Sequence, residues 1–579
     1  MRVSLKSLTL NFCERYSEKL LILIYIVKSW FMAMTVANLI INTLADLGVK
    51  RVYGVPGDSI NPLVDALRTQ KRIEFIQTRH EEGAALEAAF EAKFTGQVTA
   101  CMGTSGPGSI HLINGLYEAK MSRVPVIALT GQVETDLLYQ DYFQEVDLNR
   151  LFDDVSVFNA QIINPDSAFA IVKRAYRESM SKRGVSHLTL PVDILRKNAV
   201  PGAIDNFSFK FPKTIVDAKP AEEMINASEN PLIFIGRGAF GLSDQIGKLA
   251  EKIGAPIIYS VNSKGVVDDN DPKVMGPLGL LGSKPAVEAM KHADLLILLG
   301  TIFPYVSFIN DKAKVIQVDI DTANIGKRVR VDLPYQCTVS DFLGSVSPEE
   351  KAKKFYSKFS EDKKDWISNL EKLESDMSTP IKPEFLTSAI SRKADKDAVF
   401  IVDTGNVTVW STRDIRGGTQ RTFLLSPWLG TMGVGIPGAV GTSFATDRQV
   451  IAITGDGSFA MTMMELITAK KYSRPVKIAV YNNSKLGMIK FEEEIMGYPE
   501  WGVDLLNPDF SKIAEAIGIK GIRVEDPNKL EAAIDEFLKF DGPAVLDTVI
   551  FANERPMPPK LVFSQVKGYV TSILREKLE

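Results

Sequence analysis

Short apolar runs alternate with helix-like stretches along most of this chain, and no other feature of the sequence restricts its fold as strongly. A helical apolar spacing begins after Met34 and stops at Gly48, and a short strand, "RVYG", then runs into a Gly/Pro turn. The apolar runs "IEFIQT", "TACMGT" and "VPVIALTG" follow, separated by helix-like segments. Such an alternation produces a parallel sheet with helices on both faces. We therefore predict an α/β protein.

The alternation falls into three blocks, as expected for 579 residues, which are too many for one core. The second block has four apolar runs that predict buried strands, "PLIFIG", "APIIYS", "LLILLG" and "VIQVDI". The third runs from "DAVFIVDTG" to "PAVLDTVIF". It shares with the first block a construction of strand, glycine turn and helix, which suggests related folds. We predict three doubly wound parallel-sheet domains, at residues 34–200, 215–345 and 384–555.

The segments between and after these domains have other compositions. Residues 201–220 are polar and contain prolines, as a linker does. Residues 346–383 are dense in charge and predict a solvated helical connector. The tail at residues 556–579 predicts one short helix whose apolar face packs on its own domain, so lipid should raise the activity little.

Residues 1–33 differ from the rest of the chain. Their apolar run "LLILIYIV" is far shorter than the roughly 20 residues that span a bilayer. We interpret the segment as an extension, or as a start codon assigned upstream of Met32 or Met34, with an interfacial helix as the alternative. We expect a cytoplasmic protein whose membrane contact is at most peripheral, on the inner face of the membrane.

Composition narrows the function classes. The formal charge is −3, and a nucleic-acid binder would show a basic surplus instead. The three cysteines are widely spaced, which indicates neither a disulfide framework nor a zinc site.

Polar side chains follow two apolar runs of the third block. Asp456 stands between two glycines after residues 450–454, and Asn482 and Asn483 follow residues 476–481. Ligands of open α/β sheets bind at the carboxyl ends of strands, and Mg²⁺ prefers carboxylate, amide and carbonyl oxygens. Either dipeptide alone is typical of a turn. The pair at this spacing predicts a Mg²⁺ site formed by Asp456, Asn483 and the carbonyl of Lys485.

A diphosphate is the natural partner of such a cation. Gly457 allows close approach of the backbone, and a helix that begins near Ser458 offers N–H groups to phosphate oxygens. With these features, the Gly-Asp-Gly and Asn-Asn pair resembles the cofactor motif of thiamine diphosphate enzymes. The segments "TRHEEGAALEAA", "GTSGPGSIHLINGLYEAKMSRVPVIALTGQV" and "YFQEVD" resemble the amino-terminal domain of that family. The likeness runs from about Met34 to Tyr569.

Within the family, "GTIFPY", "IQVDID" and "GIKGIRVEDP" are similar to the bacterial quinone-reducing pyruvate oxidases, also called pyruvate dehydrogenase (quinone). The resemblance implies a pyrimidine-binding first domain, a central FAD-type domain and a third domain that binds diphosphate and Mg²⁺. Glu81 would be the glutamate that activates the cofactor through its aminopyrimidine ring. On residue type alone, Glu81 is equally an acid favoured at a helix N-terminus.

The resemblance also implies the walls of the site. Met432 would be the apolar wedge that bends the cofactor, although a methionine there is equally ordinary core. Phe143 and Gln144 match pocket residues near the thiazolium ring, and Glu492 matches a pocket acid of pyruvate oxidases, so the resemblance implies catalytic roles for all three. The residues implied to contact thiamine diphosphate are Leu429, Gly430, Thr431, Met432, Asp456, Gly457, Ser458, Asn483, Ser484, Lys485, Leu486, Gly487, Met488 and Ile489.

The middle block contains a G-x-G-x-x-G pattern at residues 236–241, after an apolar run. As a dinucleotide fingerprint it requires an acid at the end of the next strand, and "IIYSVNSKG" has none, which argues against a nicotinamide site. Many thiamine enzymes have a middle domain without nucleotide, but "GTIFPY" favours bound FAD. By resemblance, Asp319 would hold the FAD ribose and Arg237 the pyrophosphate. The other implied contacts are Gly236, Gly238, Leu278, Gly279, Leu280, Leu281, Thr301, Ile302, Phe303, Pro304 and Tyr305.

Several functions follow from the resemblance. The first is oxidative decarboxylation of pyruvate to acetate and CO₂, with electrons passing through FAD to a quinone or oxygen. A phosphate-dependent oxidase that makes acetyl phosphate is an alternative, as is acetolactate synthase, in which FAD is structural. Val157 and Phe491 stand where the synthase has lysine and tryptophan, whereas Met488 is synthase-like. Intact Glu81, Asp456 and Asn483 disfavour an inert binding protein.

The predicted site draws on the first and third domains. In this family the two domains that form one site come from two subunits. We therefore expect a homo-oligomer that is built from dimers, namely a tetramer. We expect no nucleic-acid partner.

Overall fold

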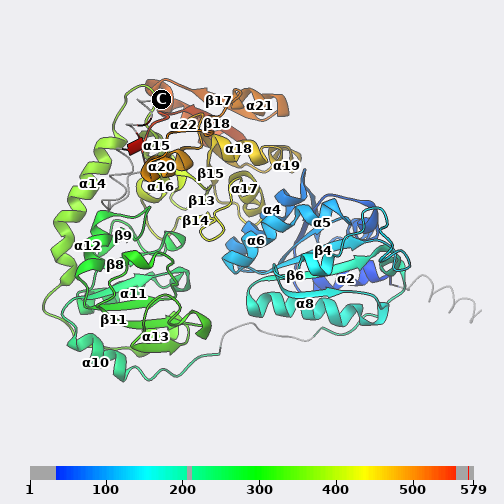
Figure 1. Ribbon diagram of the computed structural model, residues 1–579, viewed down its shortest axis with the longest axis horizontal. Helices are drawn as coiled ribbons and strands as arrows, with labels where there is room; N and C mark the ends of the chain where they lie inside the picture. The colour runs from blue at the N-terminus through cyan, green and yellow to red at the C-terminus, as the bar shows by residue number, and fades with distance from the viewer. Residues whose placement is uncertain (1–33, 205–211, 556–570, 573–574, 576–579) are drawn as a thin grey trace, which may run out of the picture.

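The computed structural model describes residues 34–204, 212–555, 571–572 and 575. Residues 1–33 and most of the tail lie outside this range, so the predictions made for them are not addressed. Three α/β domains follow one another along the chain, and each has a six-stranded sheet (Figure 1). All strand pairs within the three sheets are parallel. The predicted fold class is thereby confirmed.

The first domain has the strand order β2-β1-β3-β4-β6-β5. Its strands are β1 (Arg51–Gly54), β2 (Glu74–Gln77), β3 (Thr99–Gly103), β4 (Val126–Gln132), β5 (Ser156–Gln161) and β6 (Val185–Pro191). Its helices are α2 (Val36–Asp46), α3 (Asn61–Thr69), α4 (Glu81–Thr95), α5 (Pro107–His111), α6 (Ile113–Ser122), α7 (Leu148–Leu151), α8 (Ala168–Lys182) and α9 (Val192–Arg196).

The third domain has the order β14-β13-β15-β16-β18-β17, which repeats that of the first, as their shared construction suggested. Its strands are β13 (Val399–Val402), β14 (Thr422–Leu425), β15 (Val450–Gly455), β16 (Lys477–Asn482), β17 (Lys520–Val524) and β18 (Ala544–Val549). Its helices are α15 (Pro383–Lys393), α16 (Asn406–Asp414), α17 (Gly435–Ser443), α18 (Asp456–Thr462), α19 (Glu465–Lys471), α20 (Gly487–Met496), α21 (Phe510–Ile517) and α22 (Pro527–Lys539).

The middle domain has the order β12-β11-β10-β7-β8-β9, so the strand order reverses between β7 and β10 while the strands stay parallel. Its strands are β7 (Pro231–Ile235), β8 (Ile257–Tyr259), β9 (Val274–Pro277), β10 (Leu295–Leu299), β11 (Lys314–Asp319) and β12 (Leu333–Gln336). Its helices are α10 (Lys219–Ala227), α11 (Ser243–Ile253), α12 (Lys284–His292) and α13 (Val339–Ser345).

Four strands were expected in the middle domain, and the structure adds β9 and β12 at the two edges of its sheet. Strand β12 alternates between half-exposed and exposed residues, and β9 is only "VMGP", so neither forms an apolar run. The connector contains the helix α14 (Ser360–Glu374), on the outer side of the molecule (Figure 1). Among the described residues, no helix is both long enough and apolar enough to cross a bilayer.

Helix α4 joins the first domain to the third by packing on α17 (Figure 1). Nearly every residue of α4 is buried. Glycines make the approach possible, because a Cβ on Gly441 would lie 2.2 Å from the carbonyl oxygen of Glu87, and one on Gly438 would lie 2.8 Å from the ring of Phe90. This contact sets how the two domains are placed.

We expect Gly441→Ala to destabilise the protein by about 1–3 kcal/mol, because the added methyl would force the two helices apart. Gly247→Ala in α11 is the matched control: a Cβ there has nothing within 4 Å, and alanine should stabilise that helix by up to about 1 kcal/mol. Urea unfolding of both variants measures the difference. Equal stability of Gly441→Ala and the wild type would contradict the close packing.

Candidate active site

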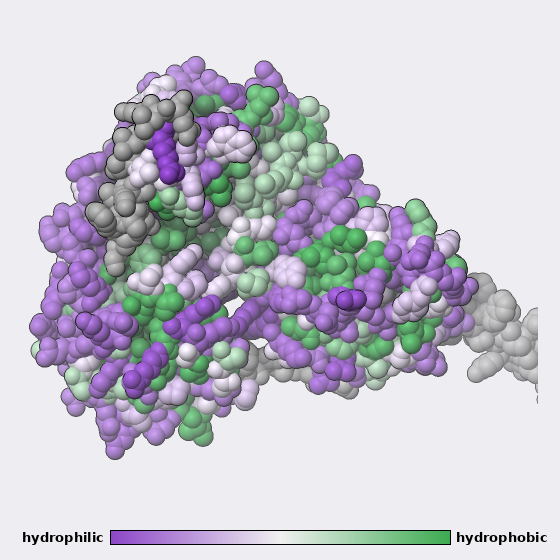
Figure 2. Space-filling view, in the orientation of Figure 1, coloured by the Kyte–Doolittle hydropathy of each residue, from purple (hydrophilic) through white to green (hydrophobic). Residues whose placement is uncertain are grey.

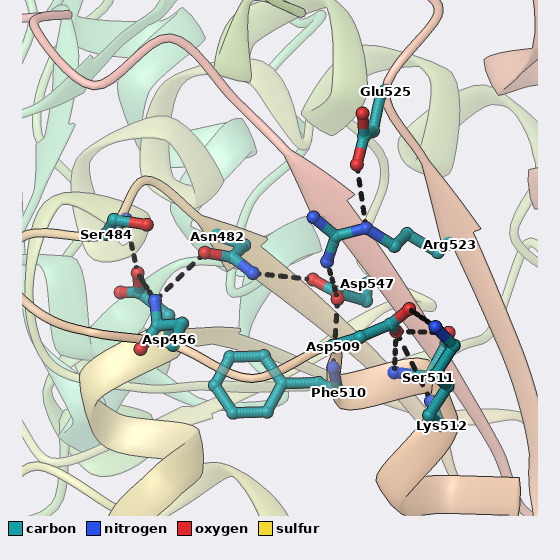
Figure 3. A network of polar contacts seen from close by, with 11 residues as sticks. Asp456, Asn482, Ser484, Asp509, Phe510, Ser511, Lys512, Arg523, Glu525 and Asp547 are labelled. Carbon is teal, nitrogen blue, oxygen red and sulfur yellow. Dashed lines mark hydrogen bonds and ion pairs between the residues drawn. The ribbon is translucent and has the colours of Figure 1, made fainter.

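The carboxylate of Asp456 lies at the carboxyl end of β15, in the first turn of α18. It accepts hydrogen bonds from the backbone N–H groups of Gly457 (2.9 Å) and Ser484 (2.6 Å) and from the Asn507 amide (2.7 Å). Figure 3 shows the bond from Ser484. Burial raises the pKa of Asp456 to about 6, and these donors oppose the rise. Among the described residues no lysine or arginine pairs with it. Asp456 is thus a buried acid held only by neutral donors, and a cation would fit beside it.

The two asparagines after β16 differ in their surroundings. Asn482 is buried, and its amide donates to Asp547 (3.0 Å) while its oxygen accepts from Asn507 (3.0 Å) (Figure 3). Asn483 is only half-buried, and its oxygen accepts the N–H of Lys485 (3.1 Å). Asn482 is therefore engaged in holding β16 to β18, which supports Asn483 as the predicted metal ligand.

Gly487 allows two amides to meet beside this edge. A Cβ on Gly487 would lie 2.7 Å from the Asn406 amide nitrogen and 2.9 Å from that of Asn483. The Asn406 side-chain oxygen is buried and has no hydrogen-bond donor among the described residues. A buried acceptor without a donor is costly, so this oxygen also fits a polar group that is supplied from outside the chain.

An apolar wall adjoins Asp456. A Cβ on Gly457 would lie 3.0 Å from the Leu486 side chain, 3.3 Å from that of Leu505 and 3.4 Å from that of Met432. Met432 and Gly457 were predicted to share a site, and the structure brings them together. The Thr431 hydroxyl beside them accepts a hydrogen bond from Asn114 of the first domain (3.0 Å).

Glu81 is the first residue of α4, and its side chain is largely buried. One carboxylate oxygen lies 3.0 Å from Nδ1 of His111, whose ring stacks on that of His80 at 4.4 Å. A Cβ on Gly108 would lie 3.1 Å from the other oxygen. The glycine-rich turn after β3 therefore makes room for the acid, and His111 fixes its direction.

The predicted pocket residues Phe143 and Gln144 lie on a loop after β4. Phe143 is 74% exposed, and Gln144 has a positive φ of 62°. The carboxylate of Glu145 accepts the N–H groups of Gln140 (3.3 Å) and Tyr142 (3.0 Å) and so holds the loop in this conformation. Glu492 lies on α20, is exposed and makes no polar contact with another described residue. Among the described residues, no hydrogen bond or ion pair joins Glu492 to Glu81.

The Gly-x-Gly turn of the middle domain lies where the strand order reverses, the usual ligand position of such sheets. A Cβ on Gly236 would lie 2.2 Å from the carbonyl oxygen of Gly300, and one on Gly238 would lie 2.8 Å from the Gly300 Cα. Arg237 is turned towards the first domain, where it donates to the Lys93 carbonyl (2.8 Å). Here Arg237 makes a domain contact, which differs from the pyrophosphate contact implied by resemblance.

The remaining residues predicted for FAD gather at the carboxyl edge of this sheet. Asp319 ends β11, and one of its oxygens accepts from Asp321 N (2.9 Å) and the Asn324 amide (3.0 Å). A Cβ on Gly279 would lie 3.0 Å from the Phe303 ring, so residues 278–281 and 301–305 meet. The loops of this edge expose large apolar side chains, 38–47% accessible: Phe240, Leu280, Tyr305, Val306 and Ile320.

Comparison with known proteins accounts for this arrangement. Three family models match consecutive parts of the chain: the thiamine pyrophosphate enzyme N-terminal TPP binding domain at residues 34–151, the central domain at 218–346 and the C-terminal TPP binding domain at 403–548. The chain belongs to the thiamine pyrophosphate enzymes.

Relatives of this thiamine pyrophosphate enzyme have several names. YdaP of Bacillus subtilis (strain 168), provisionally named as a thiamine pyrophosphate-containing protein, is 38% identical over 93% of this chain and 95% of its own. A pyruvate oxidase of Lactiplantibacillus plantarum is 33% identical over 90% and 89% of the two chains. An acetolactate synthase of Mycobacterium bovis is 31% identical over 91% and 89%.

Several residues of this site have no sequence signal. Asn507 bridges Asp456 and Asn482 from a loop that carries no motif. Asn406 is the first residue of α16, where the sequence has no recognisable motif either. His111 belongs to the segment used for the family likeness, but nothing in its spacing indicates contact with Glu81. Glu145 stands directly after Gln144 and is recognised only by the hydrogen bonds that it accepts.

We expect Asp456→Ala to lose Mg²⁺ and thiamine diphosphate together, with binding at least tenfold weaker, because the cation would lose its side-chain anion. Asp504→Asn is the matched control, since Asp504 is an exposed acid close by that pairs with Lys485. Calorimetric titration of the apoenzyme with both ligands measures the change. Retention of cofactor by Asp456→Ala after dialysis would contradict the assignment.

Proposed function

We propose that this thiamine pyrophosphate enzyme oxidises pyruvate to acetate and CO₂. Pyruvate and water give up two electrons and two protons, which pass through FAD to a quinone or to oxygen. The observation that carries the proposal is the carboxyl edge of the middle sheet, where Asp319 stands beside a rim of exposed apolar side chains. Such a rim is the kind of surface that a flat aromatic cofactor covers.

The chain's own residues have distinct parts in this proposal. When bound, thiamine diphosphate supplies the nucleophilic carbon and the electron sink that decarboxylation requires. Asp456, Asn483 and the Lys485 carbonyl would hold Mg²⁺, and Met432 with Leu486 would exclude water on the apolar side. Glu81 would hold and release a proton at the carboxylate oxygen that faces His111.

FAD would lie across the reversal point of the middle sheet. Asp319 has one oxygen engaged with Asn324 and Asp321, which fixes the carboxylate for a ribose hydroxyl. Residues 278–281 and 301–305 form one surface beside it. When bound, FAD supplies the acceptor for the two electrons, and the apolar side chains beside Asp319 would shield the site from water.

A second copy of the chain would complete the site. Exposed apolar side chains gather over α5 and α6, where Ile110 and Met121 are 45% and 38% accessible (Figure 2). Met461 and Met464 of the third domain are also exposed. Surfaces of this kind mark protein contacts. We therefore include in the proposal a homotetramer that is built from two dimers. The proposal also includes a cytoplasmic location with at most peripheral membrane contact.

Acetolactate synthesis is the second candidate, favoured by Met488 and by the relatives of that name. Incubation of the purified protein with pyruvate and a quinone, with pyruvate and oxygen, and with pyruvate, oxygen and added phosphate separates the possibilities. Acetate with reduced quinone or hydrogen peroxide supports the proposal, acetyl phosphate formed only with added phosphate supports the phosphate-dependent oxidase, and acetolactate without flavin reduction overturns both.

The purified protein should be yellow, and its flavin absorbance should bleach when pyruvate is added without oxygen. The bleaching follows because two electrons leave the substrate for FAD, and readmitted oxygen or a quinone should restore the colour. Absorbance spectra in a sealed cuvette check this. An active but colourless protein would exclude the flavin step.

Glu81→Gln should reduce pyruvate turnover at least a hundredfold and leave thiamine diphosphate bound, because the amide has the same shape but cannot exchange a proton. Glu82→Gln is the control on the neighbouring residue, whose oxygen accepts from Asn114 (2.6 Å) and would do so as an amide. Steady-state rates and cofactor titrations measure both. Wild-type rates in Glu81→Gln would remove it from the mechanism.

A further inference from the structure

Helix α4 carries a second buried acid that the proposed mechanism does not use. Glu87 is fully buried, and neither of its carboxyl oxygens has a hydrogen-bond donor among the described residues. Glu87 lies one turn after Gly83 on the same face of α4, and its carboxyl group interacts with that of Glu465.

The carboxylate of Glu465, on α19 of the third domain, already occupies the space at Gly83. A Cβ on Gly83 would lie 2.4 Å from its Oε1 atom, so only glycine allows this approach. Glu465 is itself buried. Two carboxyl groups from different domains therefore meet over one glycine of α4.

Glu465 also holds the turn that precedes Glu81. Its Oε1 atom accepts the backbone N–H groups of Arg79 (3.1 Å) and His80 (3.1 Å), and its Oε2 atom accepts from Arg79 (3.3 Å). The Thr468 hydroxyl donates to Oε2 as well. These donors suit an ionised Glu465, and they leave Glu87 without one.

Among the residues that the structure describes, neither Glu87 nor Glu465 forms an ion pair with a lysine or arginine. Glu91 lies one turn further along α4 and is engaged with Arg51 and the Tyr53 hydroxyl (2.6 Å). Helix α17, packed on the same face, has no ionisable side chain. Other ionisable groups near this part of α4 bind elsewhere: Lys93 to Glu118, Lys471 to Gln77 and Arg474 to Ser443. Burial raises the pKa of both Glu87 and Glu465, and the neighbouring Glu465 raises that of Glu87 further. Two carboxyl groups this close in a buried site favour one proton between them.

We propose that Glu87 and Glu465 share one proton, with Glu87 donating its O–H to the Glu465 carboxylate, and that this acid pair positions Glu81. Glu465 is the positioning residue, because it accepts the N–H groups of the two residues directly before α4. The hydrogen bond from Glu87 would keep Glu465 in place. The effect on turnover rests on the proposed role of Glu81, whereas the proton itself does not.

The pair makes stability depend on pH in a defined direction. In the unfolded chain Glu87 ionises near pH 4.3, but in the folded protein it keeps its proton to a higher pH. The folded state therefore binds more protons, and stability falls as pH rises above about 4.5 until Glu87 ionises in the folded state too. Loss of the proton would set two anions against each other and release the turn before Glu81.

Glu87→Gln tests the shared proton without using activity, because the amide donates to Glu465 and needs no proton. Thermal midpoints of the full chain, measured from pH 5 to pH 9, should be similar to wild type at pH 5, and Glu87→Gln should become the more stable form as pH rises. Glu223→Gln, at an exposed glutamate of α10, controls for the loss of one carboxyl group and should keep the wild-type slope. Equal slopes for wild type and Glu87→Gln would overturn the proposal.

Two further variants test the positioning. Glu87→Leu removes the donor, and Glu465→Leu removes the acceptors of the Arg79 and His80 N–H groups. Both should lower kcat at least tenfold with less than a threefold change in KM, while Glu87→Gln should keep kcat within twofold at pH 6.5 and lose less of it at pH 8.5 than wild type. Unchanged kcat in Glu465→Leu would overturn the positioning. A wild type that turns over no oxoacid would refute the proposed function, and the pH dependence of the midpoints would still decide the shared proton.

Discussion

The placement of Glu81, and with it the geometry of the whole candidate site, depends on the contact between α4 and α17. Glycines on α17 let its backbone lie against Glu87 and Phe90, so α4 is buried between two domains rather than on the surface of one. A helix packed on both sides over four turns cannot shift or rotate without opening cavities. The first residue of that helix is Glu81, whose position is therefore fixed by residues far from it in the sequence.

The carboxyl-terminal end of α4 also contacts the third domain. Lys93 is buried, pairs with Glu118 and donates to the Leu425 carbonyl of the third domain (2.6 Å). Burial lowers the pKa of Lys93, while Glu118 opposes the change. Glu118 also accepts from Ser426, and Ser426 accepts the N–H of Thr431 (3.1 Å), next to Met432. Breaking such a buried pair by removing one partner costs about 3–5 kcal/mol, so the loop that carries Met432 is tied firmly to the first domain.

The sequence was sufficient to predict those parts of the fold and of the candidate site that a local pattern of residues determines. Apolar runs between helix-like stretches predicted three parallel sheets, and the acid and amide after two of those runs predicted one polar edge. It missed β9 and β12, because edge strands need no continuous apolar run. It also missed Asn507, Glu145 and Glu465, since each acts through a contact across 25 or more residues or through backbone N–H groups that no spacing rule describes. Arg237 shows the converse, because its glycine turn predicted a ligand while the side chain contacts a neighbouring domain.

The first and third domains share one strand order, but the residues in their corresponding turns differ, and this difference makes the candidate site asymmetric. Helix α4 lies between β2 and β3, and α17 lies between β14 and β15, so equivalent helices of two like domains pack on each other. Likewise the turn after β3 corresponds to the turn after β15, but the first has Thr104 and Ser105 where the second has Asp456. The turn after β15 thus carries a carboxylate, which we propose holds a cation, while the glycines of the turn after β3 make room for Glu81. In the function we propose, the two domains of like fold have different parts: the third would hold the charged end of the cofactor, and the first would supply the acid Glu81.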